Sequence, residues 1–93
     1  MPVTVRIPTA LRAFAGNQAR TEVHAKTVGE AIEGLVRAHP DLKKHLYEDD
    51  GRLRSFVNVF RGDKDVRTLD GLATTLSDGD TILIVPSVAG GAR

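Results

Sequence analysis

Hydrophobic and polar residues alternate along several stretches of this chain, and the pattern predicts four main β-strands. Apolar side chains occupy every second position of residues 3–7, which end at Pro8, and residues 20–24 repeat the alternation. Residues 56–60 and 81–85 are the other two predicted strands. The last strand is apolar on both faces, which suits a central position in a sheet.

A single main helix is predicted between the second and third strands. Thr27 is the expected N-cap, and Glu30 follows it at the spacing of a capping box. Pro40 then stops the helix at about His39. The positions that share one helical face are mostly apolar: Val28, Ala31, Ile32, Leu35, Val36 and His39.

The remaining segments are predicted to be connections. Residues 9–18 link the first two strands, and residues 41–54 form a polar segment after the helix. A turn over residues 61–64 leads into a short extended piece at residues 65–67. Three leucines of the irregular segment that follows are expected to pack inward: Leu69, Leu72 and Leu76.

The order β-β-α-β-β(short)-β predicts an α+β domain of the β-grasp, or ubiquitin-like, type. A first hairpin, one crossing helix and a last strand parallel to the first give a mixed sheet with the helix on one face. We expect this domain to cover residues 1–86 and a flexible tail to cover residues 87–93. The tail carries Gly90-Gly91, followed by Ala92-Arg93.

Composition narrows the range of functions. The formal net charge of the 93 residues is +1, which argues against a dedicated nucleic-acid binder. Cysteine is absent, which excludes disulfides and thiolate catalysis and fits a cytoplasmic location. No apolar run of about 18 residues and no signal peptide occurs, so we expect no membrane association.

No cluster of side chains indicates catalysis or metal binding. His24, His39 and His45 lack the spacing of metal ligands, so solvated or partly packed roles are expected. Asp78-Gly79-Asp80 lacks the rest of a calcium-binding loop and is expected to be a turn. Lys43-Lys44 is interpreted as a solvated face, with covalent attachment to a partner left open.

Residues 56–67 (FVNVFRGDKDVR), with shorter segments at 69–72, 76–80 and 84–91, carry the strongest functional signal. They resemble a signature of the sulfur-carrier family, which includes the small subunit of molybdopterin synthase and the thiamin sulfur carrier. Residues 3–12 support a resemblance to the branch that contains the actinobacterial cysteine-biosynthesis carrier. The resemblance therefore extends over nearly the whole chain.

This resemblance implies a carrier that acts through its C-terminus and is not itself an enzyme. In the family, a ubiquitin-activating-type enzyme uses ATP to adenylate the carboxylate of the second glycine, and a sulfur donor converts the adenylate to a thiocarboxylate. Here that glycine is Gly91, and Ser87, Val88, Ala89 and Gly90 would enter the partner's pocket with it. The resemblance further implies that the carrier binds no cofactor and needs no catalytic side chain.

In the family that the chain resembles, the mature protein ends at the second glycine, whereas this chain continues with Ala92 and Arg93. Because Gly91 is joined to Ala92 by a peptide bond, the resemblance implies cleavage between them by a JAMM-type metalloprotease. A cloning remnant is the alternative origin of the two residues. The remaining implied partner is a sulfur-accepting enzyme that makes cysteine, a cofactor or a specialised metabolite.

We also expect a partner face on the side of the sheet opposite the helix. Phe56 and Phe60 share one face of their predicted strand and are the best candidates for it, although the burial preference of phenylalanine favours core packing for both. Three other functions remain open. They are the small subunit of molybdopterin synthase, a ubiquitin-like modifier of lysines, and a plain β-grasp binding module.

Overall fold

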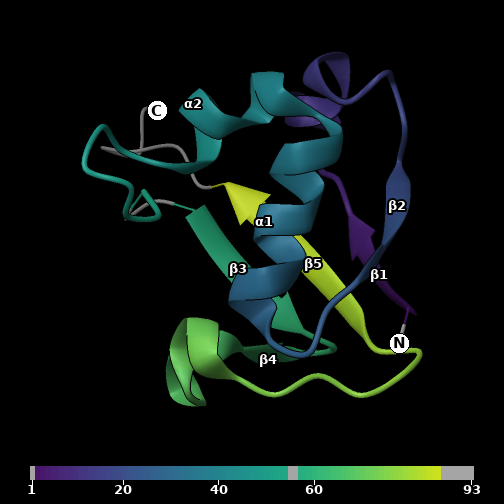
Figure 1. The fold of residues 1–93 in the computed structure, drawn as a ribbon, viewed down its shortest axis with the longest axis vertical. Coiled ribbons are helices and arrows are strands. Elements are labelled where there is room, and N and C mark those ends of the chain that lie inside the picture. Colours follow the sequence, from purple (N-terminus) through teal and green to yellow (C-terminus); the bar gives the residue numbers. More distant parts are fainter. Residues whose placement is uncertain (1, 55–56, 87–93) are drawn as a thin grey trace.

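The computed structural model describes residues 2–54 and 57–86, which form a five-stranded sheet and one main helix (Figure 1). The elements follow in this order: β1 (Pro2–Arg6), a 3-10 helix (Thr9–Phe14), β2 (Arg20–His24), α1 (Val28–Ala38), a 3-10 helix (Pro40–Leu42), α2 (Lys43–Leu46), β3 (Val57–Arg61), β4 (Lys64–Asp65), two 3-10 helices (Val66–Thr68 and Gly71–Ala73) and β5 (Thr81–Pro86). The predicted β-grasp fold is confirmed.

The last strand, β5, lies in the middle of the sheet, whose strand order is β2-β1-β5-β3-β4. It runs parallel to β1, with Val5 opposite Ile82, and antiparallel to β3, with Val59 opposite Ile84. The pairs β1–β2 and β3–β4 are antiparallel. The sheet is therefore mixed, and its first and last strands are parallel neighbours as predicted.

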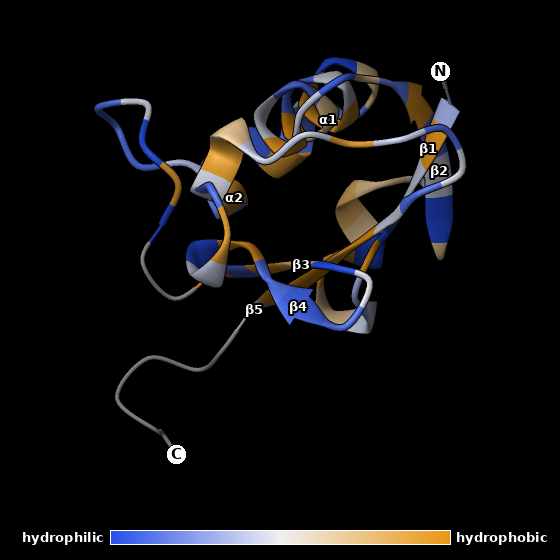
Figure 2. Ribbon diagram, turned by 90° about the horizontal axis from the view of Figure 1, so that it is seen from below, coloured by the Kyte–Doolittle hydropathy of each residue, from blue (hydrophilic) through white to orange (hydrophobic). Residues whose placement is uncertain are grey.

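Both α-helices lie on the same side of β3 and β5 (Figure 2). The face of α1 that meets the sheet buries Val28, Ala31, Ile32 and Leu35, as the helical pattern predicts. The strands contribute the facing side chains of the core: Val3, Val5, Val23, Val57, Val59, Ile82 and Ile84. Alternation along each strand leaves the other face of the sheet outside this core.

The predicted N-cap Thr27 forms at the start of α1, but the reciprocal bond of Glu30 is made one residue before the N-cap, to Lys26. The backbone N–H of Glu30 donates to Thr27 Oγ1 at 3.2 Å, and Glu30 Oε1 accepts from the backbone N–H of Lys26 at 2.9 Å. These bonds satisfy N–H groups near the helix start that have no partner within the helix. The helix ends at Ala38, one residue before the predicted end.

The piece predicted to be extended, residues 65–67, is extended only at its first residue. The Asp65 carboxylate accepts a hydrogen bond from the backbone N–H of Arg67 at 2.9 Å and caps a 3-10 helix that starts at Val66. An aspartate that bonds to the backbone two residues later favours such a turn over a strand.

The prediction that three leucines pack inward is right for one of them. Leu76 is buried, whereas Leu69 and Leu72 are 36% and 41% exposed. Two short 3-10 helices reverse the chain here, and Val66 takes the inward position at the start of this segment. The spacing of the leucines did not predict which of them face inward, because a 3-10 helix has about three residues per turn.

Both long predicted connections contain helical turns. The first holds the 3-10 helix Thr9–Phe14, which buries Leu11, and the second holds α2, which buries Leu46. Within the described ranges 2–54 and 57–86, no helix is long and apolar enough to cross a membrane.

Candidate functional site

The candidate site lies at the end of β5, because this strand leads to the C-terminal residues. Ile82 and Ile84 are buried on the helix side of the sheet, and Pro86 is the partner of Val57 on β3. The strand is therefore paired with β3 up to its last residue, whereas its pairing with β1 ends at Leu83. The predicted reactive and tail residues lie outside the described residues: Ser87, Val88, Ala89, Gly90, Gly91, Ala92 and Arg93.

The sheet face turned away from α1 carries the predicted partner residue that the structure describes. Phe60 is half-buried and alternates with the buried Val57 and Val59, so it lies on the face opposite the main core. Phe56, the second predicted residue of this face, lies outside the described residues. On β5 the half-buried Leu83 is the direct partner of Phe60.

One row of paired residues crosses the whole sheet on this face. Arg20 of β2 is opposite Arg6 of β1, and Arg6 is opposite Leu83. Leu83 is opposite Phe60, and Phe60 is opposite Asp65 of β4. An apolar pair therefore lies between two arginines at one edge and an aspartate at the other. We call these five residues the cross-sheet row.

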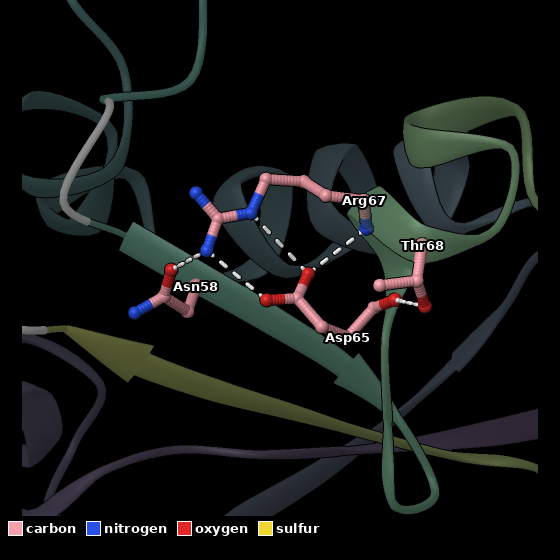
Figure 3. Close-up of polar contacts among 4 residues, drawn as sticks. All are labelled: Asn58, Asp65, Arg67 and Thr68. Carbon is pink, nitrogen blue, oxygen red and sulfur yellow. Dashed lines mark hydrogen bonds and ion pairs between the residues drawn. The ribbon is translucent and has the colours of Figure 1, made fainter.

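A polar cluster occupies the β4 end of the cross-sheet row (Figure 3). The Arg67 guanidinium donates to Asp65 Oδ2 at 3.0 Å and also to Asn58 Oδ1. Hydrogen bonds from the Arg67 side chain, and next from its backbone N–H, lower the pKa of the Asp65 carboxyl below its ordinary value. Arg67 and Asp65 thus neutralise each other on the exposed surface.

The two arginines at the other end of the row have no such partner. Arg6 and Arg20 are exposed, and neither makes a hydrogen bond or an ion pair through its side chain with any residue in the described ranges. Glu22 lies on the same face of β2, opposite Thr4, and does not pair with either arginine. The row is therefore positively charged at its β1–β2 edge.

The turn before β5 is closed by its own side chains, as predicted. Asp80 Oδ2 accepts from the backbone N–H of Ser77 at 2.8 Å, and Gly79 has a φ angle of +87°. The backbone N–H of Gly79 donates to the Pro2 carbonyl oxygen at 3.0 Å, which fixes the turn against β1. Among the described residues no group of three or more His, Asp and Glu side chains is arranged to hold a metal ion.

The sequence did not single out the environment of His45. Its ring stacks on Phe14 with centroids 4.0 Å apart, and its buried Nε2 has no hydrogen-bond partner in the described structure. Nearby in sequence, burial and then the charge of Glu33 raise the pKa of the Tyr47 hydroxyl above its ordinary value. Local periodicity does not predict these contacts because they join segments that are distant in the chain.

The comparisons with known proteins agree with the geometry. The family model described as the ThiS family matches residues 5–91. The chain is 41% identical to the sulfur carrier protein CysO of Mycobacterium tuberculosis, an alignment that covers 98% of this chain and 100% of that protein.

Two solved structures show the same fold. A chain of the Amycolatopsis orientalis BexX/CysO complex superposes with a TM-score of 0.85 and 42% identity, covering 96% of this chain and 99% of that chain. SAMP1 of Haloferax volcanii superposes with a TM-score of 0.86 and 30% identity, covering 98% and 100%. The match over residues 5–91 and the full-length similarity to CysO show that this chain belongs to the ThiS family of ubiquitin-like sulfur carriers.

Proposed function

We propose that this protein carries sulfur as a thiocarboxylate on the C-terminal carbon of Gly91. The observation that carries the proposal is the position of β5, a central strand that remains paired up to Pro86 and leads directly to the diglycine. The similarity to CysO over the whole chain supports the same function. The folded domain would present a slim terminus to an enzyme, and the enzyme would supply the catalytic groups.

The chemistry requires activation because a carboxylate is a poor electrophile. A ubiquitin-activating-type enzyme would bind ATP, and a Gly91 carboxylate oxygen would attack its α-phosphorus with release of pyrophosphate. A donor carrying sulfur in the oxidation state of sulfide would then attack the acyl carbon and displace AMP, leaving a thiocarboxylate. Glycine suits this position because it has no Cβ atom to obstruct the approach of the backbone to ATP.

The Ala92-Arg93 extension makes the full-length chain a precursor in this scheme. With the extension present, the carbonyl of Gly91 belongs to a peptide bond and offers no carboxylate. A JAMM-type metalloprotease would add water across the Gly91–Ala92 bond, release the dipeptide and expose the terminus. Activation would therefore depend on prior cleavage.

The second partner would be a biosynthetic enzyme that accepts the sulfur. A related protein has been crystallised as a BexX/CysO complex, which supports stable docking of such a carrier on another protein. The pair Phe60–Leu83 supplies a half-buried apolar surface at the middle of β5, and we propose it as the contact for both partners.

Intact-mass spectrometry tests this function. Protein ending at Gly91 is incubated with the source organism's adenylating enzyme, ATP and sulfide. The proposal predicts a product in which one oxygen has been replaced by sulfur. Full-length protein in the same mixture should remain unchanged until the protease is added. A trimmed protein that is never adenylated would contradict the proposal.

Protein modification is a second candidate, favoured by one specific similarity. The chain is 42% identical over 65 residues to small archaeal modifier protein 3 of Haloferax volcanii, covering 70% of each protein. The same adenylated Gly91 could then be transferred to a lysine amine instead of to sulfide. Isopeptide-linked remnants ending in Gly91 on other proteins would identify this use.

Stable co-purification with a large catalytic subunit would instead indicate the small-subunit role in molybdopterin synthase.

A further inference from the structure

The paired arginines of the cross-sheet row form no side-chain hydrogen bond or ion pair within residues 2–54 and 57–86. Arg6 and Arg20 are directly opposite each other on antiparallel strands, where Cβ atoms lie about 4.5–5.5 Å apart. Like charges at such positions destabilise a sheet. Among the described residues no acidic side chain forms an ion pair with either arginine, although Glu22 lies on the same face two residues from Arg20.

At the opposite end of the row, Arg67 differs from Arg6 and Arg20 because its side chain bonds to other residues of the domain. Arg67 is held by Asp65 and Asn58, so its charge is balanced within the domain. Arg6 and Arg20 are instead exposed and make no such bonds among the described residues. Their charges are available to a molecule that approaches this face.

The position of the arginines connects them to the site of chemistry. Arg6 is the strand partner of Leu83, which is paired with Phe60 and lies three residues before the end of β5. Gly91 follows Pro86 by only five residues, and such a segment reaches at most about 17 Å. An enzyme that holds Gly91 in its active site therefore comes within about 17 Å of the end of β5, the strand that contributes Leu83 to this face.

Resting on the proposed function, we propose that Arg6 and Arg20 are the charged part of the docking surface for the adenylating enzyme. They would receive carboxylate side chains of that enzyme, beside an apolar patch that covers Leu83 and Phe60. The diglycine carries no side chain that could identify the carrier, so the folded face would add recognition to that supplied by Ser87, Val88 and Ala89. Charged rim contacts contribute specificity and association rate in this way.

A protein surface fits this face better than nucleic acid. The two arginines adjoin half-buried apolar side chains, and the chain as a whole has a net charge of only +1. Phosphate backbones are bound by larger concentrations of basic charge. The expected occupant is therefore an apolar protein patch with acidic residues at one edge.

The decisive variant is Arg20→Glu in protein that ends at Gly91. The new carboxylate faces Arg6, so thermal unfolding should occur roughly 2–5 °C higher than in the wild type. In the adenylation assay, KM for the carrier should rise about tenfold with little change in kcat. Raised salt should weaken the wild type more than the variant.

Arg37→Glu is the matched control, because Arg37 is exposed on the outer side of α1 and its charge changes equally. The control should leave KM near the wild-type value, and Arg20→Lys should restore most of the affinity. An unchanged KM for Arg20→Glu would overturn the docking proposal, as would an equal rise for the control. Salt-dependent binding of an oligonucleotide through Arg20, with KM unaffected, would also overturn it. Failure of the wild type to be adenylated at all would contradict the proposed function itself.

Discussion

Phe60 and Leu83 are directly opposite each other on β3 and β5, on the sheet face that α1 does not cover. Both side chains are half-buried, so part of each is accessible to a partner while the rest packs against the sheet. The pair separates an edge with two unpaired arginines from an edge where Arg67 is neutralised by Asp65. This arrangement gives the domain one polarised face next to the strand that leads to Gly91.

Phe60→Ser should impair recognition more than folding. The side chain lies outside the main core, so we expect a small decrease in melting temperature and a clear rise in KM for adenylation. The matched core variant is Leu35→Ala, which should cost about 2–5 kcal/mol because Leu35 is fully buried on α1. Equal effects of both variants on stability, with no KM effect of Phe60→Ser, would show that Phe60 serves packing only.

Thr27→Ala should destabilise the domain by about 0.5–2 kcal/mol, because it removes the side-chain acceptor for the Glu30 N–H. Urea unfolding at neutral pH measures the loss. Thr9→Ala is the control, since Thr9 is exposed and no side-chain cap is formed at the start of its 3-10 helix. A loss for Thr9→Ala as large as that for Thr27→Ala would contradict the capping account.

In Asp65→Asn the melting temperature of the domain should fall less between neutral and acid pH than it does in the wild type. Arg67 lowers the folded-state pKa of Asp65, so the ionised carboxylate stabilises the fold above the unfolded-state pKa of about 3.9. This contribution is lost as pH falls through the lowered folded-state pKa. The variant should therefore melt slightly below the wild type at pH 7 and close to it at about pH 2. The effect should be small because the ion pair is exposed.

Thermal unfolding at several pH values, together with an NMR titration of the Asp65 carboxyl, measures this effect. Asp50→Asn offers a comparison at a second exposed pair, where a hydrogen bond from the backbone N–H of Arg52, and next one from its side chain, lower the pKa of Asp50. A difference between wild type and Asp65→Asn that does not change with pH would contradict the ion-pair explanation.

Sequence reasoning succeeded where the signal was local or alternated regularly. Thr27 and Glu30 formed a recognisable cap, whereas the strand pattern left open whether Phe60 faces the core or the outer side, and the structure places it on the outer side. It failed for Leu69 and Leu72, because the side-chain type alone does not reveal how a 3-10 helix turns the chain.

The charged part of the candidate site required the structure. Arg6 and Arg20 become neighbours only through the register of β1 against β2, and the row reaches Phe60 only because β5 lies between β1 and β3. Such pairings depend on the whole topology, so single-strand patterns do not contain them. The tail residues 87–93 were identified from the resemblance to sulfur carriers and lie outside the described residues.

Removal of Gly91 from the trimmed protein tests the central claim most directly. Protein ending at Gly91 and protein ending at Gly90 are each incubated with the adenylating enzyme, ATP and sulfide, and their intact masses and melting temperatures are measured. The account predicts that the first exchanges one oxygen for sulfur and that the second does not, while both melt at nearly the same temperature. Equal charging of the two proteins, or no charging of either, would contradict it.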